Sequence, residues 1–149
     1  MAQHLEADEL QYNHIIDGIY VGTNYCCQTH FDEGLAKEGI EADISLEAER
    51  VDAPFGVEVY LWLPVEDRTA PTQDQMRLGV GALKDLVAMG KRAYVHCKNG
   101  HGRAPTLVAA YLVSQGKSVE ESIKVVSDKR SAVHLQDVQV EALEAYKTG

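Results

Sequence analysis

The stretch that decides the fold is Val95-His96-Cys97-Lys98-Asn99-Gly100-His101-Gly102-Arg103-Ala104-Pro105-Thr106, which lies past the middle of the 149-residue chain. The apolar segment at residues 92–95 predicts a buried strand, and the segment at residues 106–113 predicts a helix. A strand, a glycine-bearing loop and a helix start together direct backbone N–H groups inward, where they can hold a tetrahedral anion. The stretch therefore predicts an anion-binding loop between a strand and a helix.

Two side chains of this loop, Cys97 and Arg103, carry its predicted chemistry. The charge of Arg103 and the dipole of the following helix both favour the thiolate of Cys97. Gly100 and Gly102 let the backbone curve closely around an anion, although an ordinary turn also uses glycines. Most strand cysteines are core residues, and the loop itself does not end in the Gly-Lys-Ser or Gly-Lys-Thr of a nucleotide-binding loop. The combination of residues and spacings favours a nucleophilic cysteine below a bound phosphoryl group.

Three segments carry a resemblance to a known family. The run His96 to Arg103 resembles the signature loop of the cysteine-dependent protein tyrosine and dual-specificity phosphatases. The segment Asp17 to Gly22 is similar to the opening strand of small dual-specificity domains, and Leu63 to Pro71 is similar to their acid-bearing loop. The resemblance implies an N-terminal extension at residues 1–11 and a phosphatase domain at residues 12–149. It also implies an α/β sandwich in which helices flank a central, mostly parallel sheet.

The residue pattern outside the signature loop agrees with this α/β class. Short apolar strands are expected at residues 19–21, 42–46 and 57–63. Helices are expected at residues 29–37, from the capping pair Thr72/Gln75 to Gly90, after the capping pair Ser118/Glu121, and at about 135–146. Helices between short apolar strands indicate a mostly parallel sheet, and such sheets place ligands at the carboxyl ends of their strands.

Composition excludes several other classes. With 14 Lys and Arg against 23 Asp and Glu, the net charge is −9, which argues against nucleic-acid and anionic-membrane partners. The acidic residues 1–9 lack a signal-peptide pattern, and three cysteines do not make a disulfide framework. These features predict a reducing, cytoplasmic location. Because no Cys-x-x-Cys or His-x-x-x-His spacing occurs, we expect neither a metal nor a cofactor.

The resemblance implies phosphomonoester hydrolysis in two displacements, with Cys97 as the nucleophile and Arg103 as the phosphate clamp. Asp67 is the predicted general acid because it stands four residues before Pro71, as the acid does in the family's loop that this segment resembles, and the neighbouring Glu66 is its rival. His96 is predicted to be structural. The predicted substrate-binding residues are Lys98, Asn99, Gly100, His101 and Gly102. Of these, Lys98 and His101 either pair with a second anionic group of the substrate or are simply solvated.

Ala104 departs from the family pattern. The family usually carries Ser or Thr directly after the arginine, where its hydroxyl stabilises the thiolate while the phosphoenzyme breaks down. Helix geometry turns Thr106 to another side, and similar Arg-Ala-Pro loops occur in some phosphoglucan phosphatases. Gln136 and Gln139 either position the water that attacks the phosphoenzyme, as glutamines do in tyrosine phosphatases, or are ordinary exposed helix residues.

The predicted function is that of a protein tyrosine or dual-specificity phosphatase whose partners are phosphorylated proteins. The alternative keeps the chemistry and changes the substrate to a phosphoinositide, a phosphoglucan or a small phosphate ester. Lys98 and His101 support that alternative because Cys-Lys-x-Gly resembles the loops of phosphoinositide phosphatases, whereas the acidic composition argues against it. A third hypothesis, a phosphate-binding adaptor without turnover, is supported only by Ala104.

Overall fold

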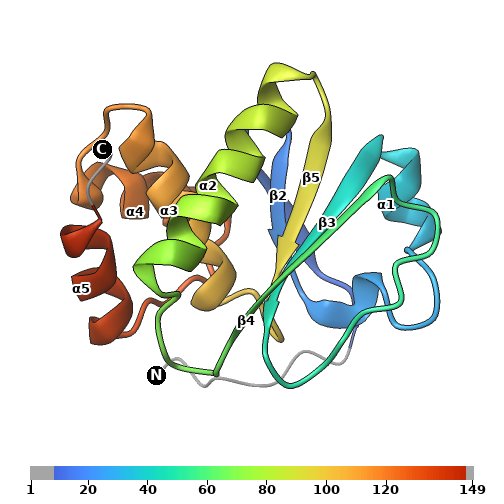
Figure 1. Ribbon diagram of the computed structural model, residues 1–149, viewed down its shortest axis with the longest axis horizontal. Helices are drawn as coiled ribbons and strands as arrows, with labels where there is room; N and C mark the ends of the chain where they lie inside the picture. The colour runs from blue at the N-terminus through green and yellow to red at the C-terminus, as the bar shows by residue number, and fades with distance from the viewer. Residues whose placement is uncertain (1–8, 147–149) are drawn as a thin grey trace.

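A computed structural model describes residues 9–146 as one sheet with helices on both of its faces (Figure 1). Most of the predicted N-terminal extension, residues 1–8, lies outside the described residues, as do residues 147–149. The predicted domain boundary at residue 12 stays a prediction. The main-chain oxygen of Glu9 accepts a hydrogen bond from the hydroxyl of Thr23, and the N–H of Thr23 donates to the oxygen of Gln11. These bonds hold residues 9–11 against the domain.

The sheet has five strands in the order β1-β2-β5-β3-β4. Their bounds are β1 Tyr12–Ile16, β2 Ile19–Gly22, β3 Ile40–Glu47, β4 Val59–Val65 and β5 Arg92–His96. Strand β1 pairs antiparallel with β2, and every other pair is parallel. The predicted mostly parallel sheet is therefore confirmed. Strand β1 was missed, and it turns into β2 through positive φ angles of 55° at Asp17 and 81° at Gly18.

Helices α2 (Gln73–Ala88), α3 (Arg103–Ser114), α4 (Val119–Lys129) and α5 (Asp137–Ala145) lie on one side of the sheet (Figure 1). Both predicted capping pairs form, because Thr72 and Ser118 accept bonds of 3.0 Å from the backbone N–H of Gln75 and Glu121. Helix α3 begins three residues before the predicted start, with Pro105 in its first turn. Proline is tolerated there because the N–H groups of a first turn have no helical partner.

Helix α1 (Glu33–Lys37) and a short 3₁₀ helix (Asn24–Cys26) lie on the other side of the sheet. The helix was predicted from residue 29, but it begins at Glu33. The Asp32 side chain caps it by accepting a bond of 3.1 Å from the N–H of Leu35. Among residues 9–146, no helix is both long and apolar enough to cross a lipid bilayer.

Two hydrophobic cores lie on opposite faces of the sheet because successive side chains of a strand alternate. Ile44 and Val95 point into the larger core, which α2 and α3 cover. Tyr94 points into the smaller core, which the segment from the 3₁₀ helix to α1 covers. The side chain of His96, two residues after Tyr94, lies on the same side of the sheet as Tyr94. Cys97 packs in the larger core. The predicted signature loop therefore begins at the carboxyl end of β5, between the two cores.

Candidate active site

Cys97 follows the last residue of β5 and forms part of the wall of a small cavity of about 90 Å³. Cys97 is 3% exposed, and it lines this cavity. The other lining residues are Asp67, Arg68, Lys98, Asn99, His101, Gly102, Arg103, His134, Gln136 and Gln139. The structure therefore brings the predicted nucleophile, clamp and acid into one cavity.

Arg103 is held with one edge of its guanidinium against the protein. Its Nη1 donates to Glu49 Oε1 and to the carbonyl of Val65, both at 2.7 Å, and its Nη2 donates to Glu49 Oε2 at 3.0 Å. Within residues 9–146 these three bonds leave the Nε–H and the second Nη2–H of its five donors for an anion. Such a pair of parallel donors suits two phosphate oxygens. The hydrogen bond from Arg103 also lowers the pKa of Glu49 below its ordinary value.

The loop between Cys97 and Arg103 is fixed from outside by Arg130, the residue after α4. Arg130 is 4% exposed, and its Nε and Nη2 donate to the carbonyls of Gly100 at 3.0 Å and Asn99 at 2.8 Å. Gly100 has a φ of 69°, and a Cβ there would lie 2.8 Å from the carbonyl oxygen of Gly22. The glycine is therefore required by the close approach of Gly22 and Arg130, and the predicted approach of Gly100 to an anion stays a prediction. Gly100 itself does not line the cavity, because its carbonyl faces Arg130 instead.

Asp67, and not its rival Glu66, faces the cavity. Its Oδ1 lies 3.6 Å from Nη2 of Arg103, and its side chain is 66% exposed. The backbone carbonyl of Glu66 closes the loop by accepting bonds from the N–H and the hydroxyl of Thr69. The loop arrangement thus favours Asp67 as the acid, and the catalytic role itself stays a prediction.

Gln139 is 1% exposed and lines the cavity, so the view of it as an ordinary exposed helix residue is wrong. Its Oε1 accepts from the N–H of Gln136 at 2.8 Å, and its Nε2 donates to the carbonyl of Thr69 at 3.0 Å. A Cβ at position 102 would lie 2.7 Å from this Oε1. Any residue larger than glycine would therefore clash with Gln139 there. Gln139 therefore joins α5, the acid loop and the signature loop. Gln136 is half-buried and also lines the cavity.

The cavity is locally positive within an acidic protein. Its lining charges are Arg68, Lys98 and Arg103 against Asp67, and the Glu49 carboxylate bound to Arg103 lowers the local charge to +1, while the whole chain carries −9. His101 and His134 lie beside them, and the main-chain N–H of His134 donates to the carbonyl of His101 at 2.7 Å. The cavity thus attracts an anion that the rest of the surface repels.

His96 is fully buried behind the loop, in agreement with the predicted structural role. Its Nδ1 lies 3.3 Å from the carbonyl oxygen of Cys97, and its Nε2 lies 2.8 Å from Asp52 Oδ2 and 3.1 Å from Asp43 Oδ1. Burial alone lowers the pKa of His96, but the two carboxylates outweigh it and raise the pKa to about 10. Burial raises the pKa of Asp43 to about 7. His96 therefore anchors the base of the loop through charged partners.

Thr106 does not replace the missing hydroxyl at Ala104. The Thr106 hydroxyl donates to the carbonyl of Gly102 at 2.7 Å, within its own helix. Ala104 is fully buried. The site therefore lacks the hydroxyl that the resemblance implies after the arginine.

Sequence reasoning missed three residues that shape the site: Glu49, Arg130 and His134. None of them lies near the signature loop in the sequence, and each reaches it only through the fold. Sequence reasoning also did not foresee the disulfide between the adjacent Cys26 and Cys27. A bond between neighbours closes no loop of chain, so it is not a disulfide framework. Cys97 is a free cysteine.

The fold and the cavity define a class of protein, the dual-specificity-type, cysteine-dependent phosphatases. A crystal structure of PTPMT1 has a TM-score of 0.76 and 28% identity, and the match covers 91% of this chain and 92% of that one. A crystal structure of human DUSP28 has a TM-score of 0.81, covering 90% of this chain and 94% of that one. Its identity is 19%, so it supports the fold alone.

The family itself follows from the sequence match. The family described as "Polymorphic toxin system, DSP-PTPase phosphatase" matches residues 19–117, and the chain belongs to it. The human Phosphatidylglycerophosphatase and protein-tyrosine phosphatase 1 is 35% identical over 93 residues, 62% of this chain and 46% of that protein. The Drosophila melanogaster PRL-1 phosphatase is 37% identical over 87 residues, 57% of this chain and 49% of that protein. The chain spans about half the length of these curated relatives.

Proposed function

We propose that this protein hydrolyses phosphomonoesters through a cysteinyl-phosphate intermediate. The observation that carries the proposal is the free thiol of Cys97 in a positive cavity, beside an arginine whose Nε–H and second Nη2–H make no hydrogen bond within residues 9–146. A thiolate, a fixed guanidinium and inward-facing backbone N–H groups are the parts that phosphoryl transfer to sulfur requires.

In the first step, the Cys97 thiolate attacks phosphorus in line and an S–P bond forms while the P–O bond to the leaving group breaks. Arg103 holds two equatorial oxygens, and the backbone N–H groups of residues 98–103 bind the charge that builds up in the transition state. Asp67 gives its proton to the leaving oxygen, which departs as a neutral alcohol or phenol. The position of Asp67 beside Arg103 supports this assignment.

In the second step, water attacks phosphorus, its proton passes to Asp67, and the S–P bond breaks to release inorganic phosphate and the thiolate. Gln136 is the better candidate for orienting this water, because both functional groups of Gln139 already bond to the protein. The hydroxyl that would assist the departing thiolate is absent at Ala104. We therefore propose that breakdown of the phosphoenzyme is the slower step.

As the substrate class we propose phosphorylated protein side chains, first of all phosphotyrosine. The cavity is small enough that it holds the phosphoryl group and leaves most of the substrate at the rim. The name of the human relative, which includes a protein-tyrosine phosphatase activity, supports this class.

One specific observation favours a second candidate, a phosphate ester with another anionic group. The rim carries two further cations, Arg68 and Lys98, in addition to Arg103. The name of the same human relative also includes a phosphatidylglycerophosphatase activity. We therefore propose a lipid phosphate as the alternative substrate of the same site.

The first experiment compares the wild-type protein with Cys97→Ser on an aryl phosphate, a phosphotyrosine peptide and a dispersed phosphatidylglycerophosphate. We expect the variant to lose turnover on every substrate, while the ratio of kcat/KM values in the wild type identifies the substrate class. Equal rates in the two proteins would remove the enzyme proposal and leave a phosphate-binding adaptor.

A second experiment tests the acid through the pH profile of kcat/KM. The rate requires a deprotonated Cys97 and a protonated Asp67, so we expect a bell-shaped profile on the acidic side of neutral. Asp67→Asn cannot supply a proton and is expected to lose the basic limb of the bell. The matched control Glu66→Gln removes the neighbouring carboxylate and should leave the profile unchanged. A profile that responds to Glu66→Gln instead would assign the acid to Glu66.

We also propose the cytoplasm, or another reducing compartment, as the place of action. A cysteine nucleophile works only as a free thiol, and oxidation of Cys97 would stop the reaction. Activity that is lost in mild peroxide and recovered with a thiol reductant would support this proposal.

A further inference from the structure

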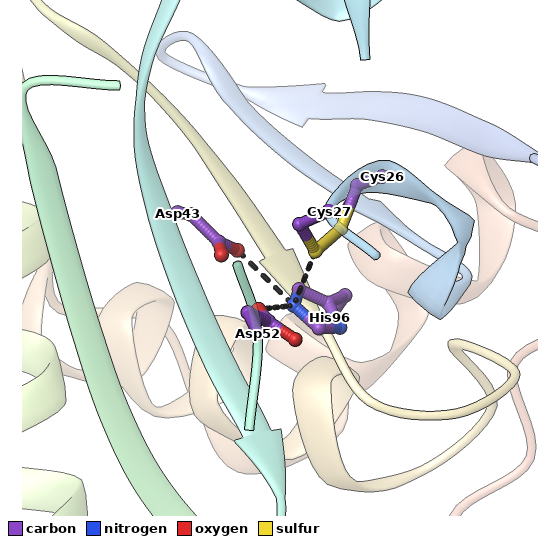
Figure 2. A group of neighbouring side chains, drawn as sticks. All are labelled: Cys26, Cys27, Asp43, Asp52 and His96. Carbon is purple, nitrogen blue, oxygen red and sulfur yellow. Dashed lines mark hydrogen bonds and ion pairs between the residues drawn. A yellow bond between two sulfur atoms is a disulfide. The ribbon is translucent and has the colours of Figure 1, made fainter. Parts of the chain in front are cut away.

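Five side chains that commonly bind metals meet behind the signature loop, on the side of the sheet opposite α3 (Figure 2). They are Cys26, Cys27, Asp43, Asp52 and His96, and one ligand atom from each lies within 4.8 Å of the others. All five are buried. None of them lines the catalytic cavity, so this cluster is a separate site.

The alternation of strand side chains brings this cluster together. On β3, Ala42 and Ile44 face the larger core, so Asp43 between them faces the smaller one. His96 faces the same side from the end of the neighbouring strand β5, which pairs with β3 in parallel. The Cys26–Cys27 pair lies over them and Asp52 comes from the loop after β3 (Figure 2). The ligands thus come from four separate segments, and no local spacing reveals them.

The carboxylate of Asp43 gives an independent sign of a missing partner. Asp43 is fully buried, and neither of its side-chain oxygens has a hydrogen bond within residues 9–146, although Oδ1 lies 3.1 Å from His96 Nε2. Buried polar atoms are nearly always hydrogen-bonded or bound to a metal, because leaving them bare is costly. Asp52 Oδ1 is likewise without a hydrogen bond, but it has Arg50 Nη2 at 3.6 Å. Asp43 Oδ1 has the ion pair with His96, whereas Asp43 Oδ2 has no partner among residues 9–146 and is the atom left to bind a cation.

His96 is oriented as a metal-binding histidine would be. Its Nε2 points into the cluster, and its Nδ1 points at the carbonyl oxygen of Cys97 at 3.3 Å. A histidine that binds a metal commonly donates its other N–H to a backbone carbonyl, which fixes the ring and the tautomer. The ring thus connects the cluster directly to the residue that carries the catalytic sulfur.

We propose that the reduced protein binds a zinc ion through Cys26, Cys27, His96 and Asp43. Two thiolates, an imidazole and a carboxylate suit Zn²⁺, whereas Mg²⁺ and Ca²⁺ prefer oxygen ligands alone. Ligand atoms around a tetrahedral zinc, at about 2.0–2.3 Å from it, lie roughly 3.3–3.8 Å apart. The five atoms here already lie within 4.8 Å of one another, so small movements of side chains complete the site.

Binding requires that the Cys26–Cys27 disulfide be opened first. A phosphine does this in a balanced step: the S–S bond takes up two electrons and two protons, while phosphorus is oxidised and gains the oxygen of water. The two thiols and the Nε2 of His96 then lose their protons to solvent as two S–Zn bonds and one N–Zn bond form, while Nδ1 keeps its proton. The redox state of the pair therefore decides whether the metal is bound, and the metal in turn holds His96 against the carbonyl of Cys97.

The test uses the full-length chain with Cys97→Ser, so that zinc cannot bind to the catalytic thiol. The protein is reduced with a phosphine or left oxidised, given Zn²⁺, desalted and analysed for bound metal. We expect one zinc ion per chain after reduction and none in the oxidised protein. Thermal unfolding of the reduced protein should shift upward by several degrees with zinc, since a ligand that binds only the folded state stabilises it.

Three variants in the same Cys97→Ser background assign the ligands. Cys26→Ser with Cys27→Ser should bind no zinc, and Asp43→Asn should bind it at least tenfold more weakly. Asp52→Asn is the comparison variant. Asp52 Oδ2 lies 2.8 Å from His96 Nε2, but Asp52 Oδ1 is paired with Arg50 Nη2 at 3.6 Å, so we expect this variant to retain the ion. Loss of zinc from Asp52→Asn with retention in Asp43→Asn would overturn the proposed fourth ligand.

Cobalt gives a readout that needs no change at the cysteine pair. Co²⁺ added to the reduced protein should produce an intense near-ultraviolet band from sulfur-to-cobalt charge transfer and the visible bands of a tetrahedral ion. Prior oxidation of the pair should abolish both. A folded, reduced protein that binds no zinc and gives no such band would overturn the proposal. Equal metal uptake by the oxidised and reduced forms would also overturn it, because it would place the ion at surface side chains.

Discussion

At the scale of single residues, Arg103 shows how one side chain serves the fold and the reaction together. Glu49 and Val65 bind one edge of its guanidinium and leave the Nε–H and Nη2–H edge for a phosphate. A lysine could not do both, because its ammonium is a single point of charge without a rigid fork. The Glu49 carboxylate therefore fixes the clamp before any substrate arrives, which lowers the entropy lost on binding.

Ala104 gives a prediction at the same scale. A hydroxyl that stabilises the leaving thiolate is worth roughly 1.5–3 kcal/mol, or one to two decades of rate. We therefore expect Ala104→Ser to raise kcat on an aryl phosphate and to shrink the pre-steady-state burst, because the phosphoenzyme then breaks down faster. Ala109→Ser, a buried alanine of the same helix, is the matched control and should raise neither. Unchanged or lower turnover in Ala104→Ser would contradict this role.

At the scale of elements, β5 and α3 form the signature loop, but α4 and α5 hold it in place. Arg130 after α4 binds two loop carbonyls, and Gln139 on α5 binds the carbonyl of Thr69 in the acid loop. Backbone N–H groups can converge on an anion only while the loop keeps its curvature. Arg130 and Gln139 therefore hold the loop and its neighbour in the shape that the proposed phosphate binding requires.

Arg130→Met tests this contribution, because it keeps the apolar stem and removes the donors. The carbonyls of Asn99 and Gly100 lose their partner, which should lower the free energy of unfolding by about 1–3 kcal/mol. We also expect weaker inhibition by inorganic phosphate and a lower kcat/KM, with the larger effect on phosphate affinity. The neighbouring exposed Lys129→Met is the control. Loss of stability without loss of phosphate affinity would make Arg130 merely structural.

At the scale of the whole molecule, contacts between distant segments decide the stability. Tyr111 on α3 donates to Asp17 Oδ2 in the β1–β2 turn at 2.7 Å, across most of the chain. Burial, and then the bond to Asp17, raises the pKa of Tyr111 to about 12 from an ordinary value of 10.0. Because the folded pKa is the higher one, this stabilisation is complete below pH 10 and is lost as the pH rises toward 12.

Tyr111→Phe tests this link by denaturant unfolding across that alkaline range. The wild-type protein should lose free energy of unfolding between pH 10 and 12, by on the order of 2 kcal/mol more than the variant. Tyr25→Phe, which removes an exposed hydroxyl, should behave as the wild type does. Parallel pH curves for the wild type and Tyr111→Phe would show that Asp17 does not hold this proton.

Much of the fold could be read from local patterns. The capping pairs at Thr72 and Ser118, the strand before Cys97 and the glycines of the loop all act within a few residues, so their sequence signals are direct. Strand β1 was missed because its short, half-exposed stretch lacks a clear alternation. The helix predicted from residue 29 failed because the cap that decides its start is Asp32.

A strand, a turn and a helix start are set by neighbouring residues, so the loop and the places of Cys97 and Arg103 in it could be predicted from the sequence alone. The folded chain was needed to show that Glu49 and Arg130 hold that loop and that Asp67 rather than Glu66 faces it. It was also needed to show that Asp43 and His96 meet two cysteines behind the loop. The physical reason is sequence separation. Contacts between distant residues depend on strand order and on which side of the sheet a side chain faces, and no short stretch of sequence records either.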